Sequence, residues 1–551
     1  MARVLHQPQT RDAIKAGIDT LAGAVIPTLG PLTGPVALDD ANRKGSPELL
    51  DDGGVIARRI LQLDDRDADI GAMLLREALW EQRQSCGDGT ATAAVLYQTV
   101  FNEGRRFISA GGDAMLLRQH LEAGIQIMLA ALQEQAHEIS SPAEIERLAL
   151  SVCGDREIAR TLMDIFDVLS PHSPIDVRDG GRDLRHEFFL GSFWESKVPS
   201  GIVFEGVAGE RIELKNTAWL ISDFEIGDLG VLVALVTCLY EAGYDSLAIV
   251  AKSFSEQIIA AQGANKQMDD FTLVYIEPTG LVDEQEAALE DLALITDGQV
   301  LRTITGHSPG AVAPDMLGAS ELAWLDRERF GIIAGAGDEE TVQREIAALE
   351  RRFALSGDSR QQELLRSRIG RLRGGSAVVY AHGSSESEMR YQKDLIERAI
   401  AAIRSALLGG VLPGGGAALL RCIERLRENY GAGSDPQERA AGQILIGAAA
   451  APCRQLLSNA GHEAPGIVVE KILSGENGAT YDLRTDDNAA VRAEEGVIDS
   501  AAAVMTAVRN GIGGAALALT VDTIVRRVNP PLAIEPGGLP SSTDIGNIEL
   551  K

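Results

Sequence analysis

Residues 86–92 read Cys86-Gly87-Asp88-Gly89-Thr90-Ala91-Thr92 and lead directly into an apolar run, 93–96. The glycines let the backbone approach a ligand closely, Asp88 offers a hard oxygen ligand, and the threonines offer hydroxyls. A glycine-rich turn at a helix N-terminus suits a phosphate, because free N–H groups and the positive end of the helix dipole point at the anion. A carboxylate at such a turn suits Mg²⁺. Taken alone, the stretch also fits an ordinary Asp-Gly turn.

Length, composition and charge narrow the class of protein. The chain has 551 residues, enough for three or four domains, and its 45% hydrophobic and 24% charged content is typical of a soluble globular protein. A net charge of −29 argues against nucleic-acid binding. Five dispersed cysteines without a CxxC pair indicate a reducing compartment and no zinc site. Because neither a signal peptide nor an apolar run of about 18 residues is evident, we expect a cytoplasmic protein without a membrane span.

Hydrophobic periodicity divides the chain into helical ends and an α/β middle. From residue 172, short apolar runs typical of strands replace the helical pattern, Gly201–Phe204 among them, and then helices and strands alternate to about residue 301. The two ends resemble each other, which predicts a domain built from both termini with the α/β part inserted. The expected helices lie at 10–26, 69–84, 93–110, 114–136, 229–242, 254–262, 282–296 and 387–408. A further helical pattern lies within 50–62, the charged stretch 338–370 fits one helix or two antiparallel helices, and several Ala-rich helices are expected through 435–527.

Four further loops accompany the opening stretch, and together they identify a family. They are Thr28-Leu29-Gly30-Pro31, Asp52-Gly53, Pro413-Gly414-Gly415-Gly416 and Gly496-Val497-Ile498-Asp499. In order and spacing, the five motifs resemble a chaperonin of the bacterial GroEL type, from about residue 10 to 528. Asp176–Gly180 and Gly374-Gly375 agree with this resemblance, the glycine pair at the position of the family's lower hinge.

The resemblance implies a multidomain α and α/β chaperonin fold. A mostly helical equatorial domain would span 1–136 and 411–528, a small intermediate domain 137–190 and 376–410, and an inserted α/β apical domain 191–375. A Pro/Gly/Ser-rich stretch, 529–551, is predicted to be a flexible tail. The family forms homo-oligomeric rings around a cavity, and its cofactors are ATP and Mg²⁺.

The resemblance also implies roles for individual residues. Thr28, Leu29, Gly30 and Pro31 would line the nucleotide, and Asp88 would hold the magnesium. Gly89, Thr90, Ala91 and Thr92 would surround the phosphates, Gly415 would lie close to the nucleotide, and Asp499 would bind the ribose. Asp52 resembles the acidic residue that positions the attacking water.

One position departs from the family pattern at the point of catalysis. Glu388 and Glu397 fix the register of the long helix 387–408, and the family's second catalytic carboxylate is replaced by Arg398. A guanidinium cannot act as a base, so we expect slow or absent hydrolysis unless Glu397 or Asp51 substitutes. Arg398 would instead grip the γ-phosphate, or, in the alternative interpretation, face solvent without a role.

The predicted client-binding face also departs from the pattern. Gly263 and Ala264 stand where the family has larger apolar residues, which predicts a narrow client range and a weak or altered interaction with a GroES-like co-chaperonin. Val236 is equally compatible with the apical core. The candidate client-binding residues are Val203, Phe204, Val233, Val236, Leu239, Tyr240, Ile258 and Ile259.

Two functions from different classes follow. The first is an ATP-dependent folding chaperonin that acts on unfolded or partly assembled clients. The second is a dedicated assembly factor for one enzyme system, like the chaperonin-like proteins that accompany multicomponent monooxygenases, with ATP mainly as a conformational ligand. A third function, a metabolic enzyme that uses ATP, is disfavoured because the sequence shows no group of residues typical of a substrate site.

Overall fold

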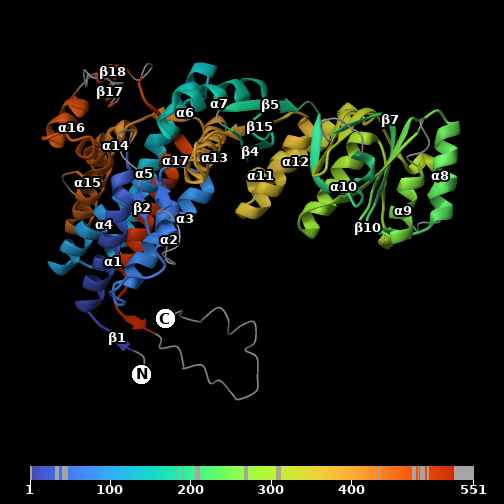
Figure 1. The fold of residues 1–551 in the computed structure, drawn as a ribbon. Helices are drawn as coiled ribbons and strands as arrows, with labels where there is room; N and C mark the ends of the chain where they lie inside the picture. The colour runs from blue at the N-terminus through green and yellow to red at the C-terminus, as the bar shows by residue number, and fades with distance from the viewer. Residues whose placement is uncertain are drawn as a thin grey trace, which may run out of the picture.

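The computed structural model describes residues 3–30, 36–39, 48–181, 183–189, 191–204, 211–265, 271–305, 312–431, 435–474, 479–481, 483, 490–492 and 496–526. These residues form an elongated molecule with a helical block at one end, an α/β block at the other and a smaller block between them (Figure 1). Pro31 and the tail 529–551 lie outside the described residues.

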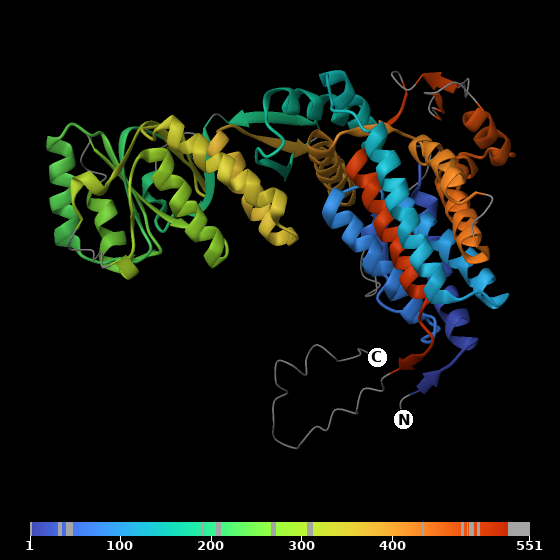
Figure 2. The ribbon, with the colours of Figure 1, turned by 180° about the vertical axis from the view of Figure 1, so that it is seen from behind.

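The helical block is built from both ends of the chain, as its blue, orange and red ribbons show (Figure 2). One apolar cluster runs through it from Leu5 to Leu132 and again from Leu412 to Ile524. β1 (Arg3–Leu5) pairs antiparallel with β20 (Ile524–Arg526), so the two ends of the block are joined. Its other elements are η1 (Ile26–Thr28), β2 (Val36–Leu38), β3 (Glu48–Leu50), β16 (Val411–Pro413), β17 (Ala479–Tyr481), β18 (Ala490–Arg492), β19 (Ile498–Ser500) and the helices α1 (Gln9–Val25), α2 (Gly53–Arg59), α3 (Asp69–Cys86), α4 (Thr90–Ser109), α5 (Ala114–Gln135), α14 (Ala417–Asn429), α15 (Pro436–Asn459), α16 (Pro465–Ser474), α17 (Ala501–Val508) and α18 (Gly514–Leu519).

One helix, Ala501–Leu519, contradicts the expectation from the sequence that no apolar segment is long enough to cross a membrane. In the sequence, Arg509 and Asn510 interrupt the apolar run, but the π-helical turn η6 (Arg509–Gly513) joins α17 and α18 into one continuous helix. By length and composition this helix is apolar enough to cross a membrane. It is more than half buried inside the helical block, where it packs against α3, α4 and α5. Burial of its apolar side chains among these helices accounts for its composition.

The middle block contains a three-stranded sheet covered by helices. β15 is the central strand, parallel to β4 and antiparallel to β5. Helix α13 packs on this sheet and also contacts α3 of the helical block, so it connects the two blocks. The elements are α6 (Pro142–Cys153), α7 (Arg156–Val168), β4 (Ile175–Asp179), β5 (Arg185–Phe189), β15 (Ser376–Ala381) and α13 (Glu386–Gly409).

The α/β block is organised around a seven-stranded sheet in the order β12-β7-β13-β14-β6-β11-β9, and β9 also pairs with β7. Successive residues of β7 alternate between two apolar clusters: Trp219 and Ile221 belong to one, and Ala218 and Leu220 to the other. The elements are β6 (Ser192–Lys197), η2 (Gly201–Phe204), β7 (Ile212–Ser222), β8 (Glu225–Ile226), α8 (Leu229–Glu241), β9 (Ser246–Val250), β10 (Ser253–Phe254), α9 (Glu256–Asn265), β11 (Thr272–Pro278), α10 (Val282–Thr296), β12 (Val300–Leu301), η3 (Thr303–Thr305), η5 (Pro314–Met316), β13 (Gly318–Leu325), β14 (Arg329–Gly335), α11 (Glu339–Leu355) and α12 (Ser359–Arg373).

One predicted strand is wrong. Gly201–Phe204 forms the 3₁₀ helix η2 instead of a strand. Phe204 and Val203 pack onto the core of the α/β block from this turn, so burial of their side chains accounts for the apolar run without sheet pairing. Apolar composition alone does not separate these two outcomes in a four-residue run.

Glycines mark the place where the chain crosses between the middle and α/β blocks. Gly191, Gly374 and Gly375 have φ of +84°, +68° and +101°, the left-handed region that favours glycine. The N–H of Gly375 donates to the carbonyl of Gly191 at 2.9 Å. The two crossing segments therefore lie side by side and are joined by a backbone hydrogen bond.

Candidate nucleotide-binding site

The loop between α3 and α4 is the centre of the candidate site. Gly87 and Gly89, with φ of +69° and +82°, reverse the chain around Asp88. The Gln82 amide donates to the Asp88 carbonyl at 2.8 Å and to the Ala503 carbonyl at 2.9 Å, which anchors the loop to α17. No side chain caps the N-terminus of α4. The first N–H groups of α4 are therefore available to an anion.

A second glycine loop has the same construction. Gly415 and Gly416, with φ of +65° and +79°, lead into α14, whose N-terminus also has no side-chain cap. β16 before this loop pairs antiparallel with β19, which places Leu412 opposite Asp499. The Gly415 backbone N–H stabilises the charged Asp499 carboxylate, so two motifs about 85 positions apart meet here.

The two carboxylates of the site are held in an environment that disfavours their charge. Burial, and then repulsion from Asp88, raises the pKa of Asp499 to about 7. Burial is also the largest cause of the raised pKa of Asp88, which Asp52 raises further and Arg398 lowers. A bound cation would relieve both effects.

These residues fit a magnesium–nucleotide complex better than a free metal ion. Among the described residues, no group of three or more His, Cys, Asp or Glu side chains could hold a metal. Asp88 would therefore supply one ligand, and phosphate oxygens and water would complete the shell, as Mg²⁺ usually requires. Two uncapped helix N-termini beside a carboxylate provide that combination of donors.

The loop Thr28–Gly30 also adjoins α4. η1 packs against α4, and the Asn459 amide of α15 donates to the carbonyls of Ile26 and Leu29 at 3.0 and 2.8 Å. A Cβ atom at Gly53 would lie 2.9 Å from the Thr90 hydroxyl, so the Asp52-Gly53 turn closely approaches the start of α4. Thr90 and Ala91 are nearly buried, and Thr92 is half-buried.

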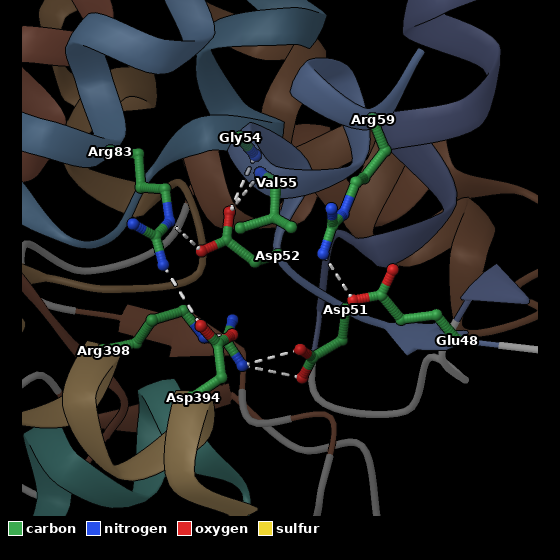
Figure 3. Close-up of polar contacts among 9 residues, drawn as sticks. All are labelled: Glu48, Asp51, Asp52, Gly54, Val55, Arg59, Arg83, Asp394 and Arg398. Carbon is green, nitrogen blue, oxygen red and sulfur yellow. Dashed lines mark hydrogen bonds and ion pairs between the residues drawn. The ribbon is translucent and has the colours of Figure 1, made fainter. Parts of the chain in front are cut away.

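Beside these loops lies a charged cluster of three acids and two arginines: Asp51, Asp52, Arg83, Asp394 and Arg398 (Figure 3). Asp52 caps α2, because its Oδ1 accepts from the N–H groups of Gly54 and Val55 at 2.7 and 3.1 Å. Its Oδ2 accepts from Arg83 Nε at 2.7 Å. The same guanidinium donates from Nη2 to Asp394 at 3.1 Å, so Arg83 joins α3 and α2 to α13.

Arg398 forms the second link between α13 and the helical block. Its Nη2 donates to both carboxylate oxygens of Asp51 at 2.8 Å, and its Nε lies 3.5 Å from Asp394. The Tyr391 hydroxyl also donates to Asp51, at 3.2 Å. Because the Arg398 side chain is only 12% exposed, the interpretation of a solvent-facing arginine without a role is wrong.

The electrostatics of Arg398 follow from its neighbours. Burial is the largest influence on its pKa and lowers it, but attraction to Asp51, Asp52 and Asp394 together raises the pKa above the usual value. Arg398 is therefore permanently charged. The two residues named as possible substitutes for the missing base are badly placed: Asp51 is paired with Arg398 itself, and Glu397 is exposed outside the cluster.

Sequence reasoning missed Arg83 and Asp394. The only local signal is the four-residue spacing of Asp394 and Arg398, which places them on one face of a helix. Arg83 sits in the last turn of α3, where a basic residue is ordinary.

The predicted client-binding residues divide into exposed and buried groups. On α8, Val233 and Tyr240 are 58% and 49% exposed, and Leu229, which the sequence analysis did not name, is 41% exposed. Leu239, Ile258 and Phe204 are nearly buried, so the prediction that they form the client surface is wrong; they complete the α/β cores. Val203, Val236 and Ile259 are half-buried and pack against those cores. The burial of Gly263 and Ala264 on α9 is not part of the described structure, so the predicted narrow client range stays a prediction at these two positions.

Fold and site together define a chaperonin. Residues 253–529, half of the chain, match the model of the TCP-1/cpn60 chaperonin family, and the chain belongs to that family. The chaperonin gp146 from the bacteriophage EL 2 (Pseudomonas aeruginosa), crystallised in the presence of ATP-BeFx, superposes with a TM-score of 0.69 at 18% identity, covering 96% of this chain and 99% of gp146. A second crystal form gives a TM-score of 0.60 at 17% identity, with the same coverage.

These comparisons confirm the predicted family and the multidomain α and α/β chaperonin fold. We use the names of the predicted domains for the three blocks: equatorial for the helical block, intermediate for the middle block and apical for the α/β block.

Proposed function

We propose that this chaperonin binds Mg-ATP between the equatorial loops and assists the folding of client proteins in a homo-oligomeric ring, with slow hydrolysis. The five loops that meet around Asp88 support nucleotide binding. When bound, Mg-ATP supplies phosphate oxygens and a divalent cation. Asp88 provides the carboxylate for the cation, the N-termini of α4 and α14 provide N–H groups for phosphate, and Asp499 accepts from a ribose hydroxyl.

The observation that carries the proposal of slow hydrolysis is the pairing of Arg398 with Asp51. A guanidinium holds its proton at all working pH values, so Arg398 cannot accept one from an attacking water. Asp52 accepts from Gly54, Val55 and Arg83, which leaves little capacity to orient water. The cluster therefore fastens α13 to the equatorial domain and offers no free carboxylate for catalysis.

The test is steady-state ATP hydrolysis beside nucleotide binding. We expect the wild-type protein to bind a fluorescent ATP analogue with Mg²⁺ but to turn over slowly. Arg398→Asp should raise turnover by about tenfold or more, because a positioned general base contributes about 10²–10⁴-fold. Arg398→Asp also leaves four acids facing Arg83 alone. The double variant Asp51→Asn, Arg398→Asp relieves this repulsion and should raise turnover further.

Arg398→Lys is the matched control, since it keeps the positive charge and should stay slow. Wild-type turnover at ordinary chaperonin rates that Arg398→Asp does not change would refute slow hydrolysis. Failure to bind the fluorescent analogue would refute nucleotide binding itself.

The dedicated assembly factor remains the second candidate. The small apolar face on α8, where Leu229, Val233 and Tyr240 are the large apolar side chains that stand out, favours a narrow client range. Refolding yields of several unrelated denatured enzymes distinguish the two candidates. Broad rescue, dependent on ATP hydrolysis, would support the general folding chaperonin and contradict the assembly factor.

A further inference from the structure

Helix α8 presents an uncharged face to solvent at the outer end of the apical domain, farthest from the equatorial domain (Figure 1). The helix is apolar, and every residue before Glu241 is uncharged. A helix that is apolar all round is normally buried on every side, but α8 stays exposed along one side. The residues of this α8 face are Leu229, Gly230, Val233, Ala234, Thr237, Cys238 and Tyr240.

The α8 face offers large apolar side chains to a partner. Leu229 and Val233 are four residues apart, and Tyr240 follows seven residues later, so the three lie along the same side of the helix. They are 41%, 58% and 49% exposed. Contiguous exposed apolar patches on soluble proteins mark interaction sites. The α8 face is therefore a docking surface, and the charges around it decide which partner fits.

Exposed carboxylates surround the α8 face. β10, which precedes α9, pairs with β8, which precedes α8, and both α9 and η5 contact α8. The exposed acids of these elements and of the turn after α8 form no ion pair with another described residue. Elsewhere in the domain, by contrast, Asp283 pairs with Arg360 at 3.0 Å. This acidic rim consists of Glu225, Asp228, Glu241, Asp245, Glu256 and Asp315.

Two exposed lysines accompany the acidic rim among the described residues. Lys215 precedes Asn216, whose carbonyl accepts from the N–H of Asp245 at 3.2 Å, and Lys252 directly precedes β10. Neither lysine forms an ion pair with a described residue. Six carboxylates against two ammonium groups leave the surroundings of the α8 face negatively charged. A cationic partner complements this charge.

We propose that the α8 face binds client segments whose apolar side chains are flanked by lysine or arginine, and discriminates against equally apolar segments flanked by acids. This inference rests on the proposed function and names the class of segment that it selects. The apolar side chains of the client would pack on Leu229, Val233 and Tyr240, because burial of apolar area favours binding. Its cations would face the acidic rim, where opposite charges speed association and like charges oppose it.

Fluorescence anisotropy of labelled peptides, titrated with the full chain, tests this preference. The peptides share one apolar core and carry lysine, glutamine or glutamate at both ends. At low salt we expect the lysine peptide to bind at least about tenfold more tightly than the glutamate peptide, equivalent to about 1.4 kcal/mol, with the glutamine peptide between them. High salt should reduce this ratio, because exposed charges are screened.

Two double variants distinguish the acidic rim from the net charge of −29 on the whole chain. Glu225→Gln, Glu241→Gln removes one rim charge near each end of α8, and it should lower the lysine-to-glutamate affinity ratio by about threefold, the scale of two exposed ion pairs. Glu339→Gln, Glu340→Gln removes two exposed charges from the first turn of α11, and it should leave the ratio unchanged.

Val233→Ser separates this inference from client binding itself. It should weaken binding of all three peptides, because each packs its apolar core on the α8 face. Equal affinities of the lysine and glutamate peptides, both dependent on Val233, would overturn the charge preference and leave client binding intact. An equal fall of the ratio in both double variants would also overturn the charge preference.

Two other results would count against the α8 face as a client site. If no peptide binds the wild type, or Val233→Ser weakens none of them, client binding on this face is refuted together with the charge preference. Loss of the oligomer in Val233→Ser, measured by analytical ultracentrifugation, would assign the face to contacts between copies of the chain instead.

Discussion

Arg398→Gln removes the charge of Arg398 but keeps a polar side chain. The change deletes two 2.8 Å bonds to Asp51 and the ion pair to Asp394, and leaves Asp51 with the Tyr391 hydroxyl. A hydrogen bond to a charged group contributes about 1.5–3 kcal/mol, and removing one member of a fully buried pair costs about 3–5 kcal/mol. Because the Asp51 side chain is 24% exposed and can be hydrated, we expect a cost of about 2–3 kcal/mol.

That cost falls on the contact between α13 and the equatorial domain. Breaking the contact should raise the opening equilibrium of α13 by about 30- to 150-fold, since about 1.4 kcal/mol corresponds to a factor of ten. Hydrogen-exchange mass spectrometry of peptides from the N-terminal half of α13 measures this opening. Peptides from α5, which is remote from the cluster, provide the internal control.

A double-mutant cycle with Asp51→Asn decides whether the pair itself is responsible. If it is, Arg398→Gln in the Asp51→Asn background should have a much smaller effect, with a coupling energy of about 1–3 kcal/mol. Effects that add to within about 0.5 kcal/mol, or unchanged exchange of α13 in Arg398→Gln, would refute the assignment of this pair as the interdomain link.

Two further predictions concern the apical domain and its boundary. Leu239→Ala should destabilise the protein by about 2–5 kcal/mol because it opens a cavity beneath α8. Val233→Ser on the exposed face should leave stability within about 0.5 kcal/mol and weaken client capture. Thermal unfolding measures the first effect and co-sedimentation with a denatured enzyme the second, and the reverse pattern would contradict the assignment of the two faces. Burial, and then repulsion from Arg373 and Arg366, lowers the pKa of His172 to about 4, so protonation is less favourable in the folded than in the unfolded chain. The free energy of unfolding should therefore fall as the pH drops from about 6.5 to about 4. In His172→Gln this fall should be smaller by about 3 kcal/mol, as denaturant unfolding at several pH values would show. Identical pH profiles of the wild type and His172→Gln would contradict the prediction.

Local patterns in the sequence predicted most of the helices and the sites of the loops. The predicted helix 114–136 and the observed α5, Ala114–Gln135, nearly coincide, because a 3.6-residue apolar repeat and the Asp113 cap are both local properties. Gly87, Gly89, Gly415 and Gly416 were found for the same reason, since the backbone conformation of each loop depends on the residues within it. The short run Gly201–Phe204 failed because four apolar residues do not distinguish a strand from a buried turn.

Side-chain burial and long-range pairing could not be predicted from these local patterns. Leu239 and Val233 occupy one apolar helix and differ only in which side faces the sheet. Arg398 was recognised from its position, but its partner Asp51 lies 347 residues away. Arg83 gave no signal because a basic residue is ordinary in the last turn of a helix.

By itself, therefore, the sequence determined the helical and α/β segments, the glycine loops and the presence of arginine at position 398, because each depends on neighbouring residues. The tertiary structure alone decided that Arg398 is buried against Asp51 and that Arg83 joins Asp52 to Asp394. Each of these depends on atoms brought together from distant parts of the chain, and the energy of a buried charge is set by those neighbours.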